Sequence, residues 1–138
     1  MLRSLKRPMH LVILALLALA ATLLGTWDAA VLCRIVIQAT TREFAFDAPP
    51  AIADGAVIVI YAGCVWFAAA MAAVFAARLW WHAQGTWMLG IVSQGMLSFL
   101  ALAGICAGAP GIWQFLLLAV TEMALFTLCR PHNRLALR

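Results

Sequence analysis

The chain has 138 residues and a formal net charge of +4, and 67% of its residues are hydrophobic while only 10% are charged. Soluble domains are about 45–50% apolar and about 25% charged, and a chain this short cannot bury so much apolar surface away from water. The composition excludes a soluble domain and predicts one integral membrane domain over residues 1–138, whose basic residues face lipid headgroups rather than nucleic acid.

The first apolar segment, residues 11–27, follows a basic head that contains Arg3, Lys6 and Arg7. About 20 helical residues cross a hydrocarbon core of ~30 Å, so this segment is near the short limit for a span. A basic head before a Leu/Ala-rich core is also typical of a signal peptide. We expect a retained helix because the apolar run is long and no Ala-x-Ala site follows at Trp27–Asp28. The alternative is that this segment is a signal peptide and is cleaved off.

Residues 28–54 are the longest polar stretch and are predicted to form an outer loop. The run from Arg34 to Gln38 fits a short strand or an interfacial helical turn equally well. The pair Pro49-Pro50 stops any helix and serves as a rigid connector into the next span. The loop holds four of the five acidic residues of the chain: Asp28, Glu43, Asp47 and Asp54.

Three further apolar segments, residues 55–77, 87–109 and 111–129, are each long enough to cross the bilayer. The sequence Ala109-Pro110-Gly111 predicts a tight turn between the last two segments, which makes them an antiparallel hairpin. The predicted fold is therefore all-α, a four-helix transmembrane bundle.

The distribution of Lys and Arg predicts the orientation of this bundle. With a cytoplasmic N-terminus, seven of the nine basic residues lie on the inner side, and only Arg34 and Arg42 lie outside. The positive-inside rule then places both termini in the cytoplasm and the protein in the cell (inner) membrane. Tryptophan prefers the membrane interface, and five of the six tryptophans fall at predicted span ends: Trp27, Trp80, Trp81, Trp87 and Trp113.

Glu122 lies near the middle of the fourth segment and is the main candidate for a functional residue. An ionisable side chain at that depth costs about 2.5–3.5 kcal/mol on insertion scales, so it is expected to face protein rather than lipid. Gln94 and Ser98 are level with Glu122 in an antiparallel hairpin. We expect an intramembrane polar cluster of these three residues, in which Gln94 or Ser98 bonds the carboxyl group.

Two stripes at helical spacing are predicted to carry this cluster. Small and polar residues recur in the third segment, where the stripe consists of Trp87, Gly90, Gln94, Ser98 and Ala101. The stripe that shares the face of Glu122 consists of Gly111, Phe115, Leu118, Glu122 and Cys129.

The sequence allows two roles for Glu122. As a hydrogen-bonded carboxyl group it would fix the register of the hairpin or a contact between subunits. As a coupling group it would bind and release a proton or cation during transport. The first role is favoured, because one carboxylate without a second charge gives no route across the membrane.

The second segment carries a stripe of mostly small residues, which predicts a helix-packing surface within the chain or between subunits. Trp66 lies in this stripe, and with Tyr61 it could line a ligand pocket, although such aromatics more often fill a bundle core. The complete packing stripe is Ala62, Trp66, Ala69, Ala73 and Ala76.

The cysteines and histidines predict no metal site and no cofactor, because none of them shows zinc-site spacing. His10 and His82 fall at the ends of adjacent spans, as a haem or metal pair would, but interfacial histidines are common. Cys33 and Cys106 both lie toward the outer side, where a disulfide is an alternative in an oxidising compartment.

These observations predict a non-enzymatic accessory, assembly or structural subunit that contacts a larger membrane protein or forms a homo-oligomer. The alternative is a small proton-coupled transporter that uses Glu122. Four short helices with one intramembrane Glu are similar in architecture to the small multidrug resistance transporters. That family has its essential Glu in the first helix, where this chain has none, so no residue role is carried over. A redox or enzyme subunit is a third interpretation and would need ligands that the sequence lacks.

Overall fold

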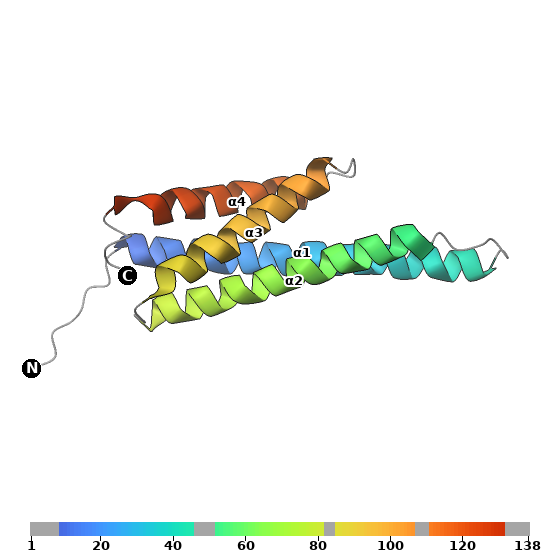
Figure 1. The fold of residues 1–138 in the computed structure, drawn as a ribbon, viewed down its shortest axis with the longest axis horizontal. Coiled ribbons are helices and arrows are strands. Elements are labelled where there is room, and N and C mark those ends of the chain that lie inside the picture. Colours follow the sequence, from blue (N-terminus) through green and yellow to red (C-terminus); the bar gives the residue numbers. More distant parts are fainter. Residues whose placement is uncertain (1–8, 46–51, 82–84, 107–110, 132–138) are drawn as a thin grey trace, which may run out of the picture.

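The computed structural model describes residues 9–45, 52–81, 85–106 and 111–131. These residues form four α-helices and no strand: α1 (Met9–Ala45), α2 (Ile52–Trp80), α3 (Thr86–Cys106) and α4 (Ile112–Cys129) (Figure 1). Each helix contains a segment that is long and apolar enough to cross a membrane. The predicted all-α class with four spans is confirmed, and the chain is a small multi-pass membrane protein.

Helix α1 is much longer than the sequence predicted. It runs for 37 residues, about 55 Å at 1.5 Å per residue, and its apolar span covers Met9–Ile35. The prediction of a loop over residues 28–54 is therefore wrong for residues 28–45, and also for residues 52–54, which belong to α2. The helix continues because its inward face keeps the same spacing of small and apolar side chains on both sides of Asp28: Leu14, Ala18, Ala21, Gly25, Ala29 and Leu32.

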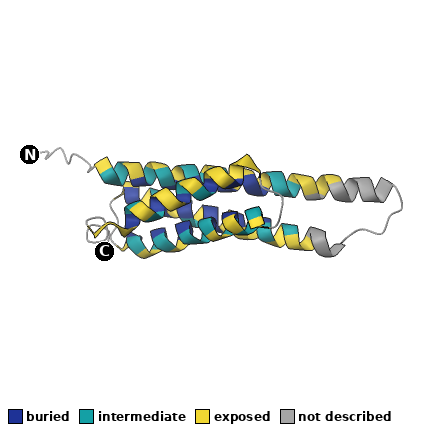
Figure 2. Cartoon of the chain, turned by 90° about the horizontal axis from the view of Figure 1, so that it is seen from above, coloured by how far each residue is buried: buried dark blue, intermediate teal, exposed yellow. Residues whose placement is uncertain are grey.

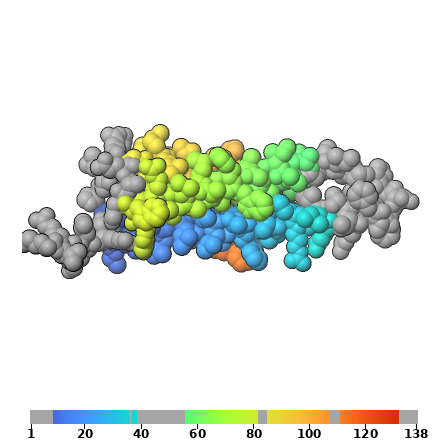
Figure 3. Space-filling view, turned by 90° about the horizontal axis from the view of Figure 1, so that it is seen from below, coloured from blue at the N-terminus to red at the C-terminus, as the bar shows by residue number. Residues whose placement is uncertain are grey.

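Helix α2 packs antiparallel along α1, and the two helices lie side by side over most of their length (Figure 3). The end of α1 and the start of α2 project beyond the other two helices (Figure 1). The connector predicted at Pro49-Pro50 lies outside the described residues. The described side chains toward the end of α1 and the start of α2 include exposed apolar residues, among them Ile35, Ile37, Val57 and Ile60.

Helices α3 and α4 form the second pair, and the buried residues of all four helices face one another (Figure 2). Helix α3 ends at Cys106, three residues before the predicted end at 109. The turn predicted at Ala109-Pro110 falls outside the described residues. At the other end of the hairpin, the indole Nε1 of Trp87 donates a hydrogen bond to the carbonyl of Leu128 over 3.3 Å.

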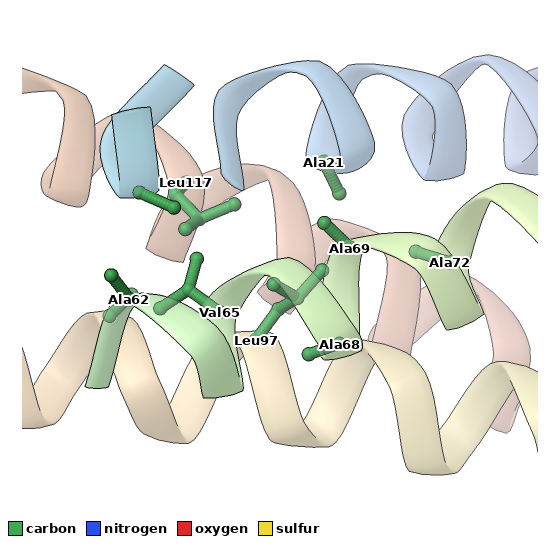
Figure 4. Packing of buried hydrophobic residues seen from close by; sticks show 10 residues of the cluster. Ala21, Ala62, Val65, Ala68, Ala69, Ala72, Leu97 and Leu117 are labelled. Atoms are coloured by element: carbon green, nitrogen blue, oxygen red, sulfur yellow. The ribbon is translucent and has the colours of Figure 1, made fainter. Parts of the chain in front are cut away.

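Small side chains dominate the core between the helices (Figure 4). Alanines from α1 and α2 pack against one leucine from α3 and one from α4; the labelled residues are Ala21, Ala62, Val65, Ala68, Ala69, Ala72, Leu97 and Leu117. A second cluster lies nearer the start of α1 and consists of Leu14, Ala18, Phe75, Leu79, Ala124 and Leu128. In lipid there is no hydrophobic drive between helices, so close packing of small residues stabilises the bundle.

The packing stripe of α2 faces this core only in part. Ala62 and Ala69 are fully buried, while Ala73 and Ala76 are half-buried. Trp66 is 47% exposed and reaches the edge of α1, where its indole Nε1 donates to the carbonyl of Thr26 over 3.4 Å. The buried part of the stripe thus meets a neighbour within the same chain.

Candidate functional site

Ser98 of α3 and Glu122 of α4 are joined by a hydrogen bond. The hydroxyl of Ser98 donates to Glu122 Oε1 over 2.5 Å. The antiparallel course of the hairpin places these two residues level with each other, near the middle of α4. The pair is therefore a polar contact within the membrane-spanning part of the chain.

Gln94 does not join this pair. It is fully buried, and neither its amide nitrogen nor its amide oxygen has a hydrogen-bond partner in the part of the chain that the structure describes. It lies on the inner face of α3 with Leu97 and Ala101, which are also fully buried. The three residues of the predicted cluster are therefore divided between the outside and the inside of the bundle.

Glu122 lies on the outer surface of the chain, where it is exposed. The sequence predicted that it faces protein, and within one chain it does not, apart from its bond to Ser98. Its neighbour Thr121 is buried instead, and the Thr121 hydroxyl donates to the carbonyl of Leu117 over 2.9 Å. Large apolar side chains on the same two helices are also exposed: Phe99, Leu102, Met123 and Phe126.

A second polar group lies inside the bundle and was not predicted. Asp28 of α1 and Gln114 of α4 are 6% and 5% exposed, and Asp28 Oδ2 and Gln114 Oε1 have no hydrogen-bond partner among the described residues. Tyr61 of α2 interacts electrostatically with Asp28 and donates a hydrogen bond of 2.6 Å to the carbonyl of Leu100 in α3. All four helices therefore contribute to this interior cluster.

Gly104 allows these polar groups to come together. A Cβ atom at this position would lie 2.7 Å from Gln114 Nε2 and 2.7 Å from the hydroxyl oxygen of Tyr61, which is too close for either contact. Only glycine leaves room for both side chains against α3. On the neighbouring faces of α1 and α4, the rings of Trp27 and Trp113 meet edge to face with centroids 6.0 Å apart.

The sequence concealed this interior cluster because Asp28 was assigned to a loop. The signal that places it in a helix is the unbroken spacing from Ala21 through Gly25 to Ala29 and Leu32. Tyr61 was considered only as a filler of the core or of a pocket. Gln114 carried no signal, because a single Gln near the end of a span is also typical of a membrane interface.

The predicted alternatives for cysteine and histidine find no support in the described residues. Cys33 and Cys106 are both free, so the disulfide considered for them is absent from this structure. His82 lies outside the described residues, so its proposed pairing with His10 is not described. No group of three His, Cys, Asp or Glu residues gathers in the described parts of the chain.

Comparisons with protein-family models, with curated proteins and with solved structures found no match for this chain. Its function must therefore be inferred from the chemistry of its own residues. The two polar groups within the spans, one on the outer surface and one inside, are the features that carry chemical information.

Proposed function

We propose that this protein is an accessory, assembly or structural subunit that acts through helix–helix contacts in the membrane, without catalytic activity of its own. The observation that supports this proposal is the position of Glu122, which is exposed on the outer surface of the α3–α4 hairpin. The surface that includes Ser98, Phe99, Glu122, Met123 and Phe126 is called the hairpin face below.

The free energy of Glu122 in lipid favours a protein contact at the hairpin face. A carboxyl group at the centre of a span costs about 2.5–3.5 kcal/mol on insertion scales, and ionisable residues in spans almost always face protein or a water-filled cavity. Ser98 provides one hydrogen bond to one of the two carboxyl oxygens. A helix from another subunit would remove the carboxyl group from lipid and supply further hydrogen bonds.

The surroundings of Glu122 also suit a contact between helices. Phe99 and Phe126 are 70% and 67% exposed and stand on the two helices that carry the polar pair. Aromatic residues and methionine are enriched at protein interfaces. Gly95 lies one turn before Phe99 in α3, and a Cβ at Gly95 would meet nothing within 4 Å. A helix of another subunit can therefore approach the backbone of α3 closely at this position.

The partner is either a larger membrane protein or a second copy of this chain. In both cases the contacting helix should present a hydrogen-bond donor to Glu122, such as Ser, Thr, Asn, Gln or a basic residue. We place the protein in the cell (inner) membrane with both termini in the cytoplasm. Exposed Arg78 and Arg130, at the ends of α2 and α4, lie at the same end of the bundle as the start of α1 (Figure 1) and support this orientation.

Purification in mild detergent tests the proposal. Wild type should elute with a stoichiometric partner or as a homo-oligomer, and Glu122→Leu should elute as the separate chain with unchanged helical content. Glu122→Gln should keep the assembly, because glutamine retains the hydrogen-bonding capacity of a protonated carboxyl group. Thr26→Ala is the matched control, since it removes another exposed polar group in a span, whose hydroxyl bonds the Thr22 carbonyl of its own helix. Normal assembly of Glu122→Leu would contradict the proposal.

The alternative function is a small proton-coupled transporter in which Glu122 carries the proton. The outward position of Glu122 suits a contact better than a path through this bundle. The same variants distinguish the two functions. In a transporter, Glu122→Gln should fold and assemble normally yet lose all transport, because the amide cannot bind and release a proton.

A further inference from the structure

We propose that Asp28, Tyr61 and Gln114 form a binding site for a small monovalent cation of the sodium class inside the bundle. This inference does not depend on the proposed function, since the site lies on the inner faces of the helices and Glu122 lies on the outer surface.

The need for a cation follows from the burial of Asp28. Its side chain is 6% exposed within the apolar span of α1, and Oδ2 has no hydrogen-bond partner among the described residues. A buried carboxylate is strongly unfavourable unless an opposite charge or a set of hydrogen-bond donors compensates it. The nearest basic residue along α1 is Arg34, which is exposed on the surface rather than directed into the core. A bound cation would supply the missing charge.

The groups around Asp28 are the type of ligand that alkali and other hard cations prefer. Gln114 brings an amide oxygen that is buried and has no partner. The Tyr61 hydroxyl donates its hydrogen to the Leu100 carbonyl over 2.6 Å, which leaves the lone pairs of the phenol oxygen free to point at a cation. A carboxylate, an amide oxygen and a phenol oxygen are all hard oxygen ligands.

The charge of the site selects a monovalent ion. One carboxylate balances one positive charge, whereas calcium sites use six to eight oxygen ligands and usually several carboxylates. No group of three or more His, Cys, Asp or Glu residues forms among the described residues, so the site has no cluster of carboxylates of the calcium type. A proton would also neutralise Asp28, and the experiment below distinguishes a proton from sodium.

The site lies near one end of the α3–α4 hairpin. Gln114 lies in the first turn of α4, and Gly104 lies in the last turn of α3, so both are close to the end of the hairpin opposite the start of α1. Gly104 lets the Tyr61 and Gln114 side chains pack against α3, because any Cβ there would lie 2.7 Å from both. The site therefore lies within one or two helical turns of that end of the hairpin.

The thermal stability of the purified chain in sodium chloride and in choline chloride, at equal ionic strength and pH 8, tests the site. A ligand that binds only the folded state raises the melting temperature with its concentration. We expect wild type to melt roughly 5 °C higher in sodium than in choline, and the difference to vanish in Asp28→Asn. Thr127→Ala, whose hydroxyl bonds the Met123 carbonyl in the same α4 helix, should keep the full difference.

Tyr61→Phe and Gln114→Leu keep the experiment decisive if Asp28→Asn does not fold. Each removes one oxygen ligand, so each should require roughly ten times more sodium for the same shift in melting temperature. Equal melting temperatures in sodium and choline for wild type would overturn the proposal. So would a sodium effect that survives in Asp28→Asn, or a dependence on pH alone, which would mean that the site takes only a proton.

Discussion

Gly90 of α3 offers a sharp test of the packing between the two helix pairs. A Cβ atom at Gly90 would lie 2.6 Å from Cε2 and 2.6 Å from Cζ of Phe75, and 3.1 Å from Cδ1 of Leu128. Phe75 and Leu128 are both fully buried, so the Phe75 ring has little room to move. Gly90→Ala therefore forces α3 away from α2 and α4, or the ring into an unfavourable rotamer.

The size of the effect follows from two opposing terms. Forcing an extra methyl group into a packed core typically costs about 1–3 kcal/mol. Replacing glycine by alanine within a helix returns about 0.5–1 kcal/mol. Gly63 of α2 is the matched control, because a Cβ there would meet nothing within 4 Å. Both variants gain the same helix stability from the replacement of glycine by alanine. The difference between their free energies of unfolding therefore reports the cost of the steric overlap alone.

Thermal unfolding in detergent, followed by circular dichroism, measures this difference. Gly63→Ala should melt at or slightly above the wild-type temperature. Gly90→Ala should melt roughly 2–12 °C below Gly63→Ala, since 1 kcal/mol shifts the midpoint of a chain of this size by about 2–4 °C. Equal melting temperatures for the two variants would refute the close approach of α3 to Phe75.

Two further predictions concern the α1–α2 contact and the orientation. Ala69→Leu should lower the free energy of unfolding by about 1–3 kcal/mol through overpacking, because Ala69 is buried against α1. The adjacent Ala70 is exposed, so Ala70→Leu should be nearly neutral in the same melting assay. In a variant without the native cysteines, a membrane-impermeant thiol reagent applied to intact cells should label Gly111→Cys and spare Trp81→Cys. Labelling of both from outside would contradict cytoplasmic termini.

The sequence predicted the number of spans correctly because each contains an apolar run long enough for the bilayer. It failed at Asp28, where one acidic residue was treated as the end of a span. A carboxyl group costs only a few kcal/mol on insertion scales, and a helix can absorb that cost when its inner face remains small and apolar. Ala29 and Leu32 continue that face beyond Asp28, so α1 continues as well.

The candidate site was predictable in part for a similar reason. Hairpin geometry sets which residues are level, and Ser98 and Glu122 are indeed joined by a hydrogen bond. Spacing along one helix does not show which face turns toward lipid, because lipid-facing and core-facing residues are equally apolar here. Gln94 therefore lies inside the bundle and Glu122 outside, although the sequence placed both at one contact.

Photo-crosslinking in native membranes tests most directly whether the hairpin face binds another protein. A benzophenone amino acid at Met123, which is 60% exposed beside Glu122, should form a discrete protein adduct. The same probe at Val74 of α2, which is 52% exposed, should react with lipid alone. The adduct at position 123 should disappear in the background of Glu122→Leu. Lipid adducts alone at both positions would contradict the assignment of this surface to a protein partner.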